Sequence, residues 1–256
     1  MTMQAMIFAA GLGTRLKPLT DNMPKALVEV GGQTLLQRTL IKLKNAGANH
    51  VVVNVHHFAD QIKAYLCAHD NFGMVVDISD ESTSLLNTGG GVKKAGYLFS
   101  AKENILIHNV DILSNIDLRK FYASHSACDA LLLVSERQTK RYLLFDNDRQ
   151  LVGWTNIETG EVRSPYPDLR VEDCSRYAFA GIHSFSPRLL SAMDAFPDKF
   201  SIVDFYLSVC AKCRISGYVK PDLKLLDVGK LDTLKRIAKP DMGMKYLTDE
   251  QILEQI

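Results

Sequence analysis

Apolar residues follow two different patterns along the first half of this chain. Residues 50–55 (HVVVNV) form an almost continuous apolar run, which is typical of a strand buried on both faces of a sheet. Residues 35–46 repeat leucine at helical spacing, with Thr34 as a candidate N-cap and Gly47 as the residue that ends the helix. The same criteria predict further strands at residues 5–10, 74–79, 104–109, 130–135 and 178–183, and further helices at residues 58–68, 92–99, 117–126, 187–196 and 201–212.

The order strand–helix–strand at this spacing predicts an α/β fold. Right-handed crossovers through a helix place consecutive strands in parallel and helices on both faces, so a mostly parallel, mixed sheet is expected. In the second half, residues 143–146 and 151–154 predict a hairpin joined by Asn-Asp-Arg-Gln. Residues 155–176 are polar and contain two prolines, which favours a mobile flap. Residues 239–256 form a charged tail that we expect to pack on the protein or to mediate an oligomer.

Composition places the chain among ordinary globular proteins. It has 256 residues, 46% of them hydrophobic and 23% charged, with a formal net charge of +1. Such a balance gives no overall field to attract nucleic acid or an anionic membrane, so we expect neither as a partner. The N-terminus enters a predicted strand at once and apolar runs stay short, which favours a cytoplasmic protein.

Cysteine and histidine give little evidence of a metal or redox site. The five cysteines are an odd number and form no disulfide framework. Cys210 and Cys213 make one C-x-x-C in a predicted apolar helix, without a second pair, so buried thiols are the better interpretation. His56 and His57 follow a predicted strand without an acidic or thiol partner in sequence, which favours loop or core histidines.

Candidate phosphate chemistry lies directly after the first predicted strand. Gly11 and Gly13 lack a Cβ, so backbone amides can approach an anion closely. Arg15 follows as a planar donor suited to phosphate oxygens. Pro24 fixes the chain before Lys25, which brings a second positive charge towards the turn. These residue types together predict a polyphosphate site.

Two common glycine loops do not fit this stretch. A dinucleotide-binding fingerprint needs a third small residue where this chain has Leu16, and a P-loop needs Lys-Ser or Lys-Thr after its last glycine. Taken alone, G-x-G-T-R also fits a strand-to-helix turn with a surface arginine. The longer stretch AAGLGTRLKPLT at residues 9–20, followed by Pro24-Lys25 and a predicted strand that includes Val28 to Val30, resembles the signature of the sugar-1-phosphate nucleotidyltransferases.

Two later stretches carry the same resemblance. Asn109-Val110-Asp111 resembles the family's N-G-D motif with valine in place of glycine, and it follows a buried strand, where α/β sheets bind ligands. It lacks the D-x-D typical of GT-A glycosyltransferases in general. Leu225-Leu226-Asp227-Val228-Gly229 resembles W-x-D-V-G-T, with leucine for tryptophan and Lys230 for threonine. The resemblance implies that Asp111 and Asp227 bind Mg²⁺ as the cofactor.

The resemblance also implies roles for individual residues. Arg15, Lys25, Asp111 and Asp227 are the expected catalytic residues. Expected nucleotide-binding residues are Ala10, Gly11, Gly13, Thr14, Glu81, Thr88 and Gly89. Expected sugar-binding residues are Asn109 and Gly181. Residues 1–238 are then the catalytic domain, with a Rossmann-like, GT-A-type nucleotidyltransferase fold.

The implied reaction joins an NTP and a sugar 1-phosphate into an NDP-sugar and pyrophosphate. Thr88-Gly89-Gly90-Gly91 and residues 179–182 look most like the N-acetylmuramate 1-phosphate uridylyltransferases, which implies UTP and an N-acetylated amino-sugar phosphate. Asn87 keeps a mannose- or heptose-1-phosphate guanylyltransferase as an alternative, because its amide pairs with a purine edge. Two alternatives from other classes are a non-catalytic nucleotide-sugar-binding regulator and a structural partner subunit of another transferase.

Overall fold

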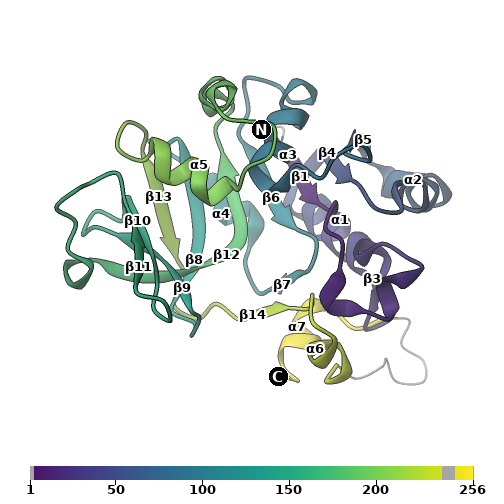
Figure 1. The fold of residues 1–256 in the computed structure, drawn as a ribbon. Helices are drawn as coiled ribbons and strands as arrows, with labels where there is room; N and C mark the ends of the chain where they lie inside the picture. Colours follow the sequence, from purple (N-terminus) through teal and green to yellow (C-terminus); the bar gives the residue numbers. More distant parts are fainter. Residues whose placement is uncertain (1–2, 238–245, 256) are drawn as a thin grey trace. The chain divides into compact units, whose positions relative to one another are not determined.

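The computed structural model describes residues 3–237 and 246–255, which divide into two compact units. Among the described residues, the first unit comprises the chain up to residue 85, residues 107–119 and the chain from residue 223 onward. The second unit comprises residues 86–106 and 120–222. Figure 1 gives the labels of the helices and strands in both units.

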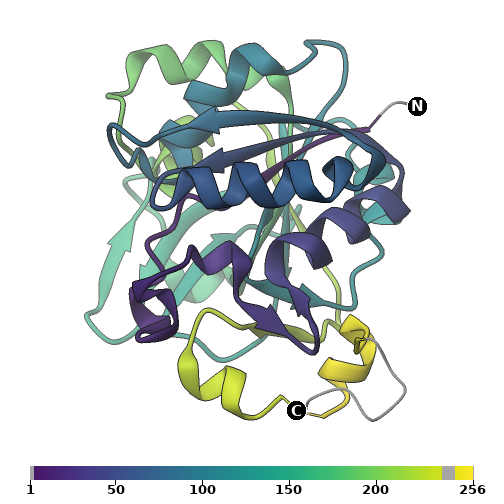
Figure 2. The ribbon, with the colours of Figure 1, turned by 90° about the vertical axis from the view of Figure 1, so that its right-hand side faces the viewer.

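The sheet of the first unit has the strand order β6-β1-β4-β5, with β6 belonging to this unit from residue 107 onward. Strand β4 pairs in parallel with both β1 and β5. Figure 2 shows helices α1 and α2 running alongside these strands. The bounds are β1 (Met3–Phe8), α1 (Leu35–Ala46), β4 (Ala48–Val55), α2 (Ala59–Ala68), β5 (Val75–Asp80) and β6 (Ile105–Asn109). The predicted α/β architecture, with a mainly parallel central sheet flanked by helices, is confirmed.

Local sequence explains where these elements begin and end. The Thr34 hydroxyl accepts a hydrogen bond from the Gln37 amide and caps α1, and Gly47 ends it at φ 107°, as predicted. Strand β1 ends at Phe8, earlier than predicted. The amides of Ala9 and Ala10 donate to the Asn54 side chain, so they leave the ladder of the sheet.

Shorter elements complete the first unit. Strand β7 (Ile112–Ser114) pairs antiparallel with β14 (Leu225–Asp227), and β2 (Glu29–Val30) pairs with β3 (Gln33–Thr34). Single helical turns include η1 (Thr14–Leu16), η2 (Leu19–Asp21), η3 (Lys25–Leu27) and η4 (Asp70–Gly73). Helices α6 (Leu231–Lys235) and α7 (Asp249–Leu253) lie near the C-terminus and are drawn in yellow-green and yellow in Figure 2.

The predicted charged tail lies partly outside the described residues. Its described part packs on the N-terminal region of the first unit. The Leu247 amide donates to the Gly31 carbonyl at 2.9 Å, and the buried Arg38 guanidinium donates to the Leu247 carbonyl at 2.7 Å. Arg38 also pairs with Asp249 at 3.2 Å. These contacts confirm the packing role for the described part of this segment, and the oligomer role stays a prediction.

The second unit is mainly antiparallel. Strand β12 pairs antiparallel with β8 and β9, β10 pairs antiparallel with β9 and β11, and β13 pairs in parallel with β8. The bounds are α3 (Asn87–Ala95), β8 (Ala130–Ser135), β9 (Arg141–Phe145), β10 (Leu151–Asn156), β11 (Glu161–Arg163), β12 (Ser175–Phe185), α5 (Ile202–Val209) and β13 (Ile215–Val219). Helix α4 (Leu118–Ala123) begins in the first unit and ends in the second. The β9–β10 hairpin is confirmed.

Three predicted elements of the second unit differ in detail. Helix α3 begins at Asn87 rather than Val92, so the predicted glycine turn forms the first part of the helix. Residues 187–196 form two 3-10 segments, η7 (Pro187–Leu189) and η8 (Ser191–Ala195), rather than one α-helix. The segment expected to be a flap, residues 155–176, contains β11. This strand pairs with β10, so part of the segment is held in the sheet by backbone hydrogen bonds. Across the described residues, every helix is too short or too polar to cross a bilayer.

Candidate active site

Four charged side chains from distant parts of the sequence meet in the first unit. Lys25 Nζ lies 2.6 Å from Asp111 Oδ2, and Arg15 Nη1 lies 3.4 Å from Asp227 Oδ2. Arg15 Nη2 lies 4.0 Å from Asp111 Oδ2, so the arginine lies between the two carboxylates. The structure therefore brings together all four residues expected to be catalytic, and we call them the charged cluster.

Backbone pairing holds the two aspartates close to each other. Asp111 follows β6, and the amide of Val110 donates to the Phe8 carbonyl at 3.3 Å, which ties this turn to β1. Asp227 ends β14, where it pairs with Ile112 of β7. The Val228 amide then donates to the Asp111 carbonyl at 3.0 Å. Main-chain hydrogen bonds thus fix the backbone position of each aspartate.

The Asp111 carboxylate is largely covered by protein. Its side chain is only 10% exposed, whereas that of Asp227 is 34% exposed. Lys25 is also largely covered, at 15% exposed. A carboxylate and an ammonium group that lose most of their water need each other, because an unpaired charge is costly to bury. The Lys25–Asp111 pair is therefore a preformed part of the charged cluster.

Gly229 packs directly against the charged cluster. A Cβ added there would lie 2.6 Å from Asp111 Oδ2, 2.9 Å from Arg15 Nη2 and 2.9 Å from Asp227 Oδ1. The Gly229 amide also donates to Asp227 Oδ1 at 2.9 Å. No larger residue fits this position unless the charged side chains move apart. The glycine of the predicted Asp-Val-Gly stretch thus keeps space for them.

The loop after β1 is shaped as a place for an anion. Gly13 has φ 66°, and its carbonyl accepts from the Leu16 amide and from the Thr20 hydroxyl, which closes the turn. A Cβ at Gly11 would lie 3.8 Å from Lys25 Nζ, so this loop runs beside the lysine. Within the described chain, the amides of residues 11–14 donate to no other group. These amides, together with Arg15, can therefore donate to phosphate oxygens.

A buried polar network that the sequence did not reveal supports this loop. Asn54 Oδ1 accepts from the amides of Ala9 at 2.7 Å and Ala10 at 3.2 Å, and its Nδ2 donates to Glu81 Oε1 at 2.7 Å. Glu81, an expected nucleotide-binding residue, is fully buried. His56 Nδ1 donates to the Glu81 carbonyl at 2.6 Å, consistent with a structural histidine. In the sequence, Asn54 is visible only as a polar residue that follows three consecutive valines in a predicted buried strand.

The remaining expected nucleotide- and sugar-binding residues take varied positions. In the second unit, the Thr88 hydroxyl accepts from the Ile202 amide at 3.0 Å and the Gly89 amide donates to the Phe200 carbonyl at 2.9 Å. Gly181 lies on β12 with φ 74°. Asn109 ends β6 in the first unit, where its carbonyl accepts from His108 Nδ1 at 2.7 Å. Their roles towards a ligand stay predictions.

The charged cluster fits a magnesium ion better than a transition metal. Asp111 and Asp227 supply only carboxylate oxygens, and both approach Arg15, so they face one region. Mg²⁺ typically uses one or two carboxylates together with water and substrate phosphates. In the part of the chain that the structure describes, no group of three or more His, Cys, Asp or Glu residues is arranged as a metal cage. Any metal here therefore depends on substrate oxygens as well.

Known proteins are similar to this chain in sequence and in fold over much of its length. A family model described as nucleotidyl transferase matches residues 4–239. The chain is 33% identical over 246 residues to an N-acetylmuramate alpha-1-phosphate uridylyltransferase from Caulobacter vibrioides, covering 92% of this chain and 97% of that protein. It is 29% identical over 140 residues to a D-glycero-alpha-D-manno-heptose 1-phosphate guanylyltransferase from Aneurinibacillus thermoaerophilus, covering 55% of this chain and 60% of that protein. The crystal structure of HddC from Yersinia pseudotuberculosis complexed with GMP-PN has a TM-score of 0.71 at 22% identity, covering 92% and 98% of the two chains.

Proposed function

This chain belongs to the nucleotidyl transferase family, and we propose that it transfers the uridylyl group of UTP to the 1-phosphate of an N-acetylated amino sugar. Pyrophosphate is the second product. The observation that carries the proposal is the charged cluster, in which Lys25 and Arg15 contact Asp111 and Asp227. The choice of UTP and an N-acetylated sugar is supported by the full-length similarity to the Caulobacter vibrioides uridylyltransferase.

The reaction makes modest chemical demands on the protein. An oxygen of the sugar phosphate is already an anion and therefore a nucleophile. It attacks the α-phosphorus directly, so no protein side chain needs to form a covalent intermediate. A new phosphorus–oxygen bond forms as the bond between the α-phosphorus and the bridging oxygen breaks, and pyrophosphate leaves. Catalysis then depends on in-line positioning and on neutralising the negative charge of four phosphate groups.

Residues of the first unit can supply that positioning and charge. The amides of residues 11–14 and the Arg15 fork bind the β- and γ-phosphates that leave as pyrophosphate. Lys25 neutralises charge near the reacting phosphate. Arg15 is 55% exposed on its side chain, so it can turn from the carboxylates towards an incoming phosphate at little cost. Lys25 stays beside Asp111, because both are largely buried.

Asp111 and Asp227 are the residues that would hold Mg²⁺. When bound, the ion would neutralise phosphate oxygens and increase the electrophilicity of phosphorus. The aspartates themselves have a second role in the structure described here, since they orient Lys25 and Arg15 before substrates bind. A regulator that only binds nucleotide sugars would need neither the metal-binding carboxylates nor their pairing with both cations.

Guanylyl transfer to a mannose or heptose 1-phosphate is the second candidate. The similarity to a heptose 1-phosphate guanylyltransferase covers 55% of this chain. Asn87, the first residue of α3, is exposed, so its amide is accessible to a purine edge. An enzyme that rejects the wrong base by size alone discriminates by about 1–3 kcal/mol in kcat/KM. Discrimination is larger when a polar edge of the base or of the site is left without a hydrogen-bond partner. We therefore expect UTP to exceed GTP in kcat/KM by at least about tenfold.

The test is a side-by-side rate measurement on the purified chain. UTP, GTP, CTP and dTTP are each supplied with N-acetylmuramate 1-phosphate, N-acetylglucosamine 1-phosphate, mannose 1-phosphate or a heptose 1-phosphate, with pyrophosphate release as the readout. Faster turnover of GTP with mannose or heptose phosphate would replace the uridylyl proposal with the guanylyl one. A chain that releases no pyrophosphate with any pair would instead favour the regulator or the partner subunit.

A further inference from the structure

Asp249, the first residue of α7, pairs with two cations at once. Its Oδ1 lies 3.2 Å from Arg38 Nη1, and its Oδ2 lies 3.2 Å from Lys42 Nζ. Both cations come from α1, where residues four positions apart share one face. Arg38 is buried and the other two side chains are largely covered, so each charge needs its partner. One carboxylate thus joins two cations of the first unit.

The first of these cations holds the segment that carries Lys25. Arg38 Nε and Nη2 donate to the Val30 carbonyl at 2.8 Å and 2.6 Å. Two main-chain hydrogen bonds then lead back towards the lysine. The Leu35 amide donates to the Val28 carbonyl at 3.0 Å, and the Val28 amide donates to the Lys25 carbonyl at 3.1 Å. The backbone that carries Lys25 is therefore tied to α1, and Arg38 is one of its attachments.

The second cation holds the strand that follows Asp111. Lys42 Nζ donates to the Ser114 carbonyl at the end of β7 and lies 3.3 Å from the Ser114 hydroxyl. Strand β7 begins directly after Asp111 and pairs with β14, where Asp227 lies opposite Ile112. Helix α7 itself packs against β7, as Figure 1 shows. A shift of Lys42 would therefore move the strand on which both aspartates of the charged cluster depend.

The described residues 246–255, which we call the C-terminal segment, hold this shared carboxylate in place. A Cβ at Gly31 would lie 3.1 Å from both Leu247 Cβ and Ile252 Cδ1, so the segment fits closely against the turn after β2. Leu247 and Ile252 are buried. The Thr248 hydroxyl accepts from the Gln251 amide, and the Gln251 side chain accepts from the Thr248 amide, which fixes the first turn of α7. The carboxylate is thus presented by an ordered, buried element.

We propose that Asp249 is a positioning residue for the charged cluster. By holding both cations of α1, it fixes the segment of Lys25 and the strand of Asp111 relative to each other. These two segments supply the 2.6 Å ion pair of the cluster. The inference rests on the proposed function, because the position of the pair matters to catalysis only if the cluster reacts. A displacement of about 1 Å at a reacting group lowers a rate by about a hundredfold.

Hydrogen–deuterium exchange of the purified chain tests the positioning without any substrate. Asp249→Asn keeps the size of the side chain but removes the shared negative charge. We expect amides of residues 28–31 and 110–116 to exchange at least about threefold faster, together with those of the C-terminal segment. Glu250→Gln, at the exposed neighbouring position, is the matched control and should leave exchange unchanged. Faster exchange confined to the C-terminal segment would overturn the proposal, because Asp249 would then only dock that segment.

Turnover measures the consequence for catalysis. Rates are recorded with the NTP and sugar 1-phosphate that the parent protein converts fastest, at a temperature where circular dichroism shows each variant folded. We expect the kcat of Asp249→Asn to fall at least about tenfold. The KM for the NTP should change less than about twofold, because Arg15 and the loop of residues 11–14 bind its leaving phosphates. An unchanged kcat would overturn the proposal. A parent protein that converts no pair contradicts the proposed function, while the exchange measurement still tests the positioning.

Lys42→Met is the second variant, for the case that Asp249→Asn fails to fold. It leaves Asp249 paired with Arg38 and removes only the attachment of β7. We expect faster exchange at β7 but not at β2, and a kcat at least about threefold lower. Lys44→Met is its matched control, since Lys44 is an exposed lysine of the same helix that donates to the Phe72 carbonyl. Equal exchange at β7 and equal kcat in the two lysine variants would overturn the proposal.

Discussion

The ammonium group of Lys25 lies 2.6 Å from Oδ2 of Asp111, 86 positions further along the chain. Both side chains are largely covered, so the contact joins a buried positive charge to a buried negative one. The pair fixes Lys25 against the end of β6 before any substrate arrives. It also makes Asp111 a structural as well as a chemical residue.

Replacing Asp111 tests both of these roles. We expect Asp111→Asn to lower kcat/KM by at least about a hundredfold, roughly 3 kcal/mol of transition-state stabilisation. The amide keeps an oxygen for Lys25 but loses the charge, so the free energy of unfolding should also fall, by about 1–3 kcal/mol. Steady-state rates at saturating Mg²⁺ and urea unfolding measure the two effects. Asp21→Asn, at an exposed aspartate paired with Lys17, is the control. Near-normal turnover of Asp111→Asn would remove this residue from the mechanism.

Arg15 is expected to bind the leaving pyrophosphate rather than the sugar. Arg15→Lys keeps the charge but loses the fork, so in the reverse reaction the KM for pyrophosphate should rise by about tenfold. The KM for the NDP-sugar should change less. Lys17→Arg, two positions away and paired with Asp21, should leave both constants unchanged. If instead the NDP-sugar KM rises most, the arginine acts on the sugar side.

Gly229→Ala is predicted to damage the charged cluster without unfolding the protein. The added Cβ would lie 2.6 Å from Asp111 Oδ2 and 2.9 Å from Arg15 Nη2, so these groups must shift apart. Transition-state contacts depend on distances of this order, and we expect kcat/KM to fall by at least about tenfold. The melting temperature should change by only a few degrees, which corresponds to a change of about 1 kcal/mol or less in the free energy of unfolding. An alanine variant with full activity would show that the cluster tolerates the displacement.

His183 should make stability fall in mild acid. Burial lowers the pKa of this fully buried histidine to about 3, whereas an unfolded histidine titrates near 6.5. Between these values the unfolded state binds one more proton, so the free energy of unfolding falls as pH falls, with a slope of up to about 1.4 kcal/mol per pH unit. Above about pH 6.5 both states are neutral and the histidine adds no pH dependence.

The measurement compares urea unfolding from pH 4 to pH 7 in two variants. His183 Nδ1 lies 2.5 Å from the Tyr206 hydroxyl, so His183→Phe is combined with Tyr206→Phe to leave neither group unpaired. In this double variant the free energy of unfolding should depend less steeply on pH, and the difference should correspond to at most one bound proton. Tyr206→Phe alone, which keeps the titrating ring, should retain the steeper slope. His108 is also buried with its pKa lowered to about 4, and it is unchanged in both variants. Equal slopes would contradict the assignment to His183.

Local sequence patterns determined much of the fold. The apolar run of residues 50–55 and the leucine spacing of residues 35–46 predict β4 and α1, because burial on two faces or on one helical face requires those periods. The end of α1 at Gly47 follows from the left-handed conformation that this residue adopts. The motifs around Arg15, Asp111 and Asp227 also named the members of the charged cluster in advance.

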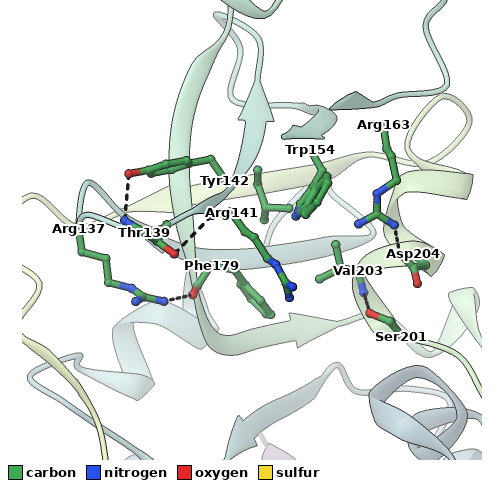
Figure 3. A pocket seen from close by; sticks show the side chains of 11 residues that line it. Arg137, Thr139, Arg141, Tyr142, Trp154, Arg163, Phe179, Ser201, Val203 and Asp204 are labelled. Carbon is green, nitrogen blue, oxygen red and sulfur yellow. Dashed lines mark hydrogen bonds and ion pairs between the residues drawn. The ribbon is translucent and has the colours of Figure 1, made fainter. Parts of the chain in front are cut away.

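Only the tertiary structure decided how those residues work together. Whether Asp111 is open or paired depends on Lys25, which is distant in sequence, and the burial of Glu81 depends on Asn54 of a neighbouring strand. The contacts of Arg163 have the same origin, since Arg163 meets Trp154 through strand register and its partner Asp204 comes from a separate helix (Figure 3). Periodicity records which face of one element is buried, but it carries no information on which distant side chain lies opposite. Which side chains lie opposite each other is decided only when the strands pair, and the ion pairs of Lys25 and Arg15 with the two aspartates form as a result.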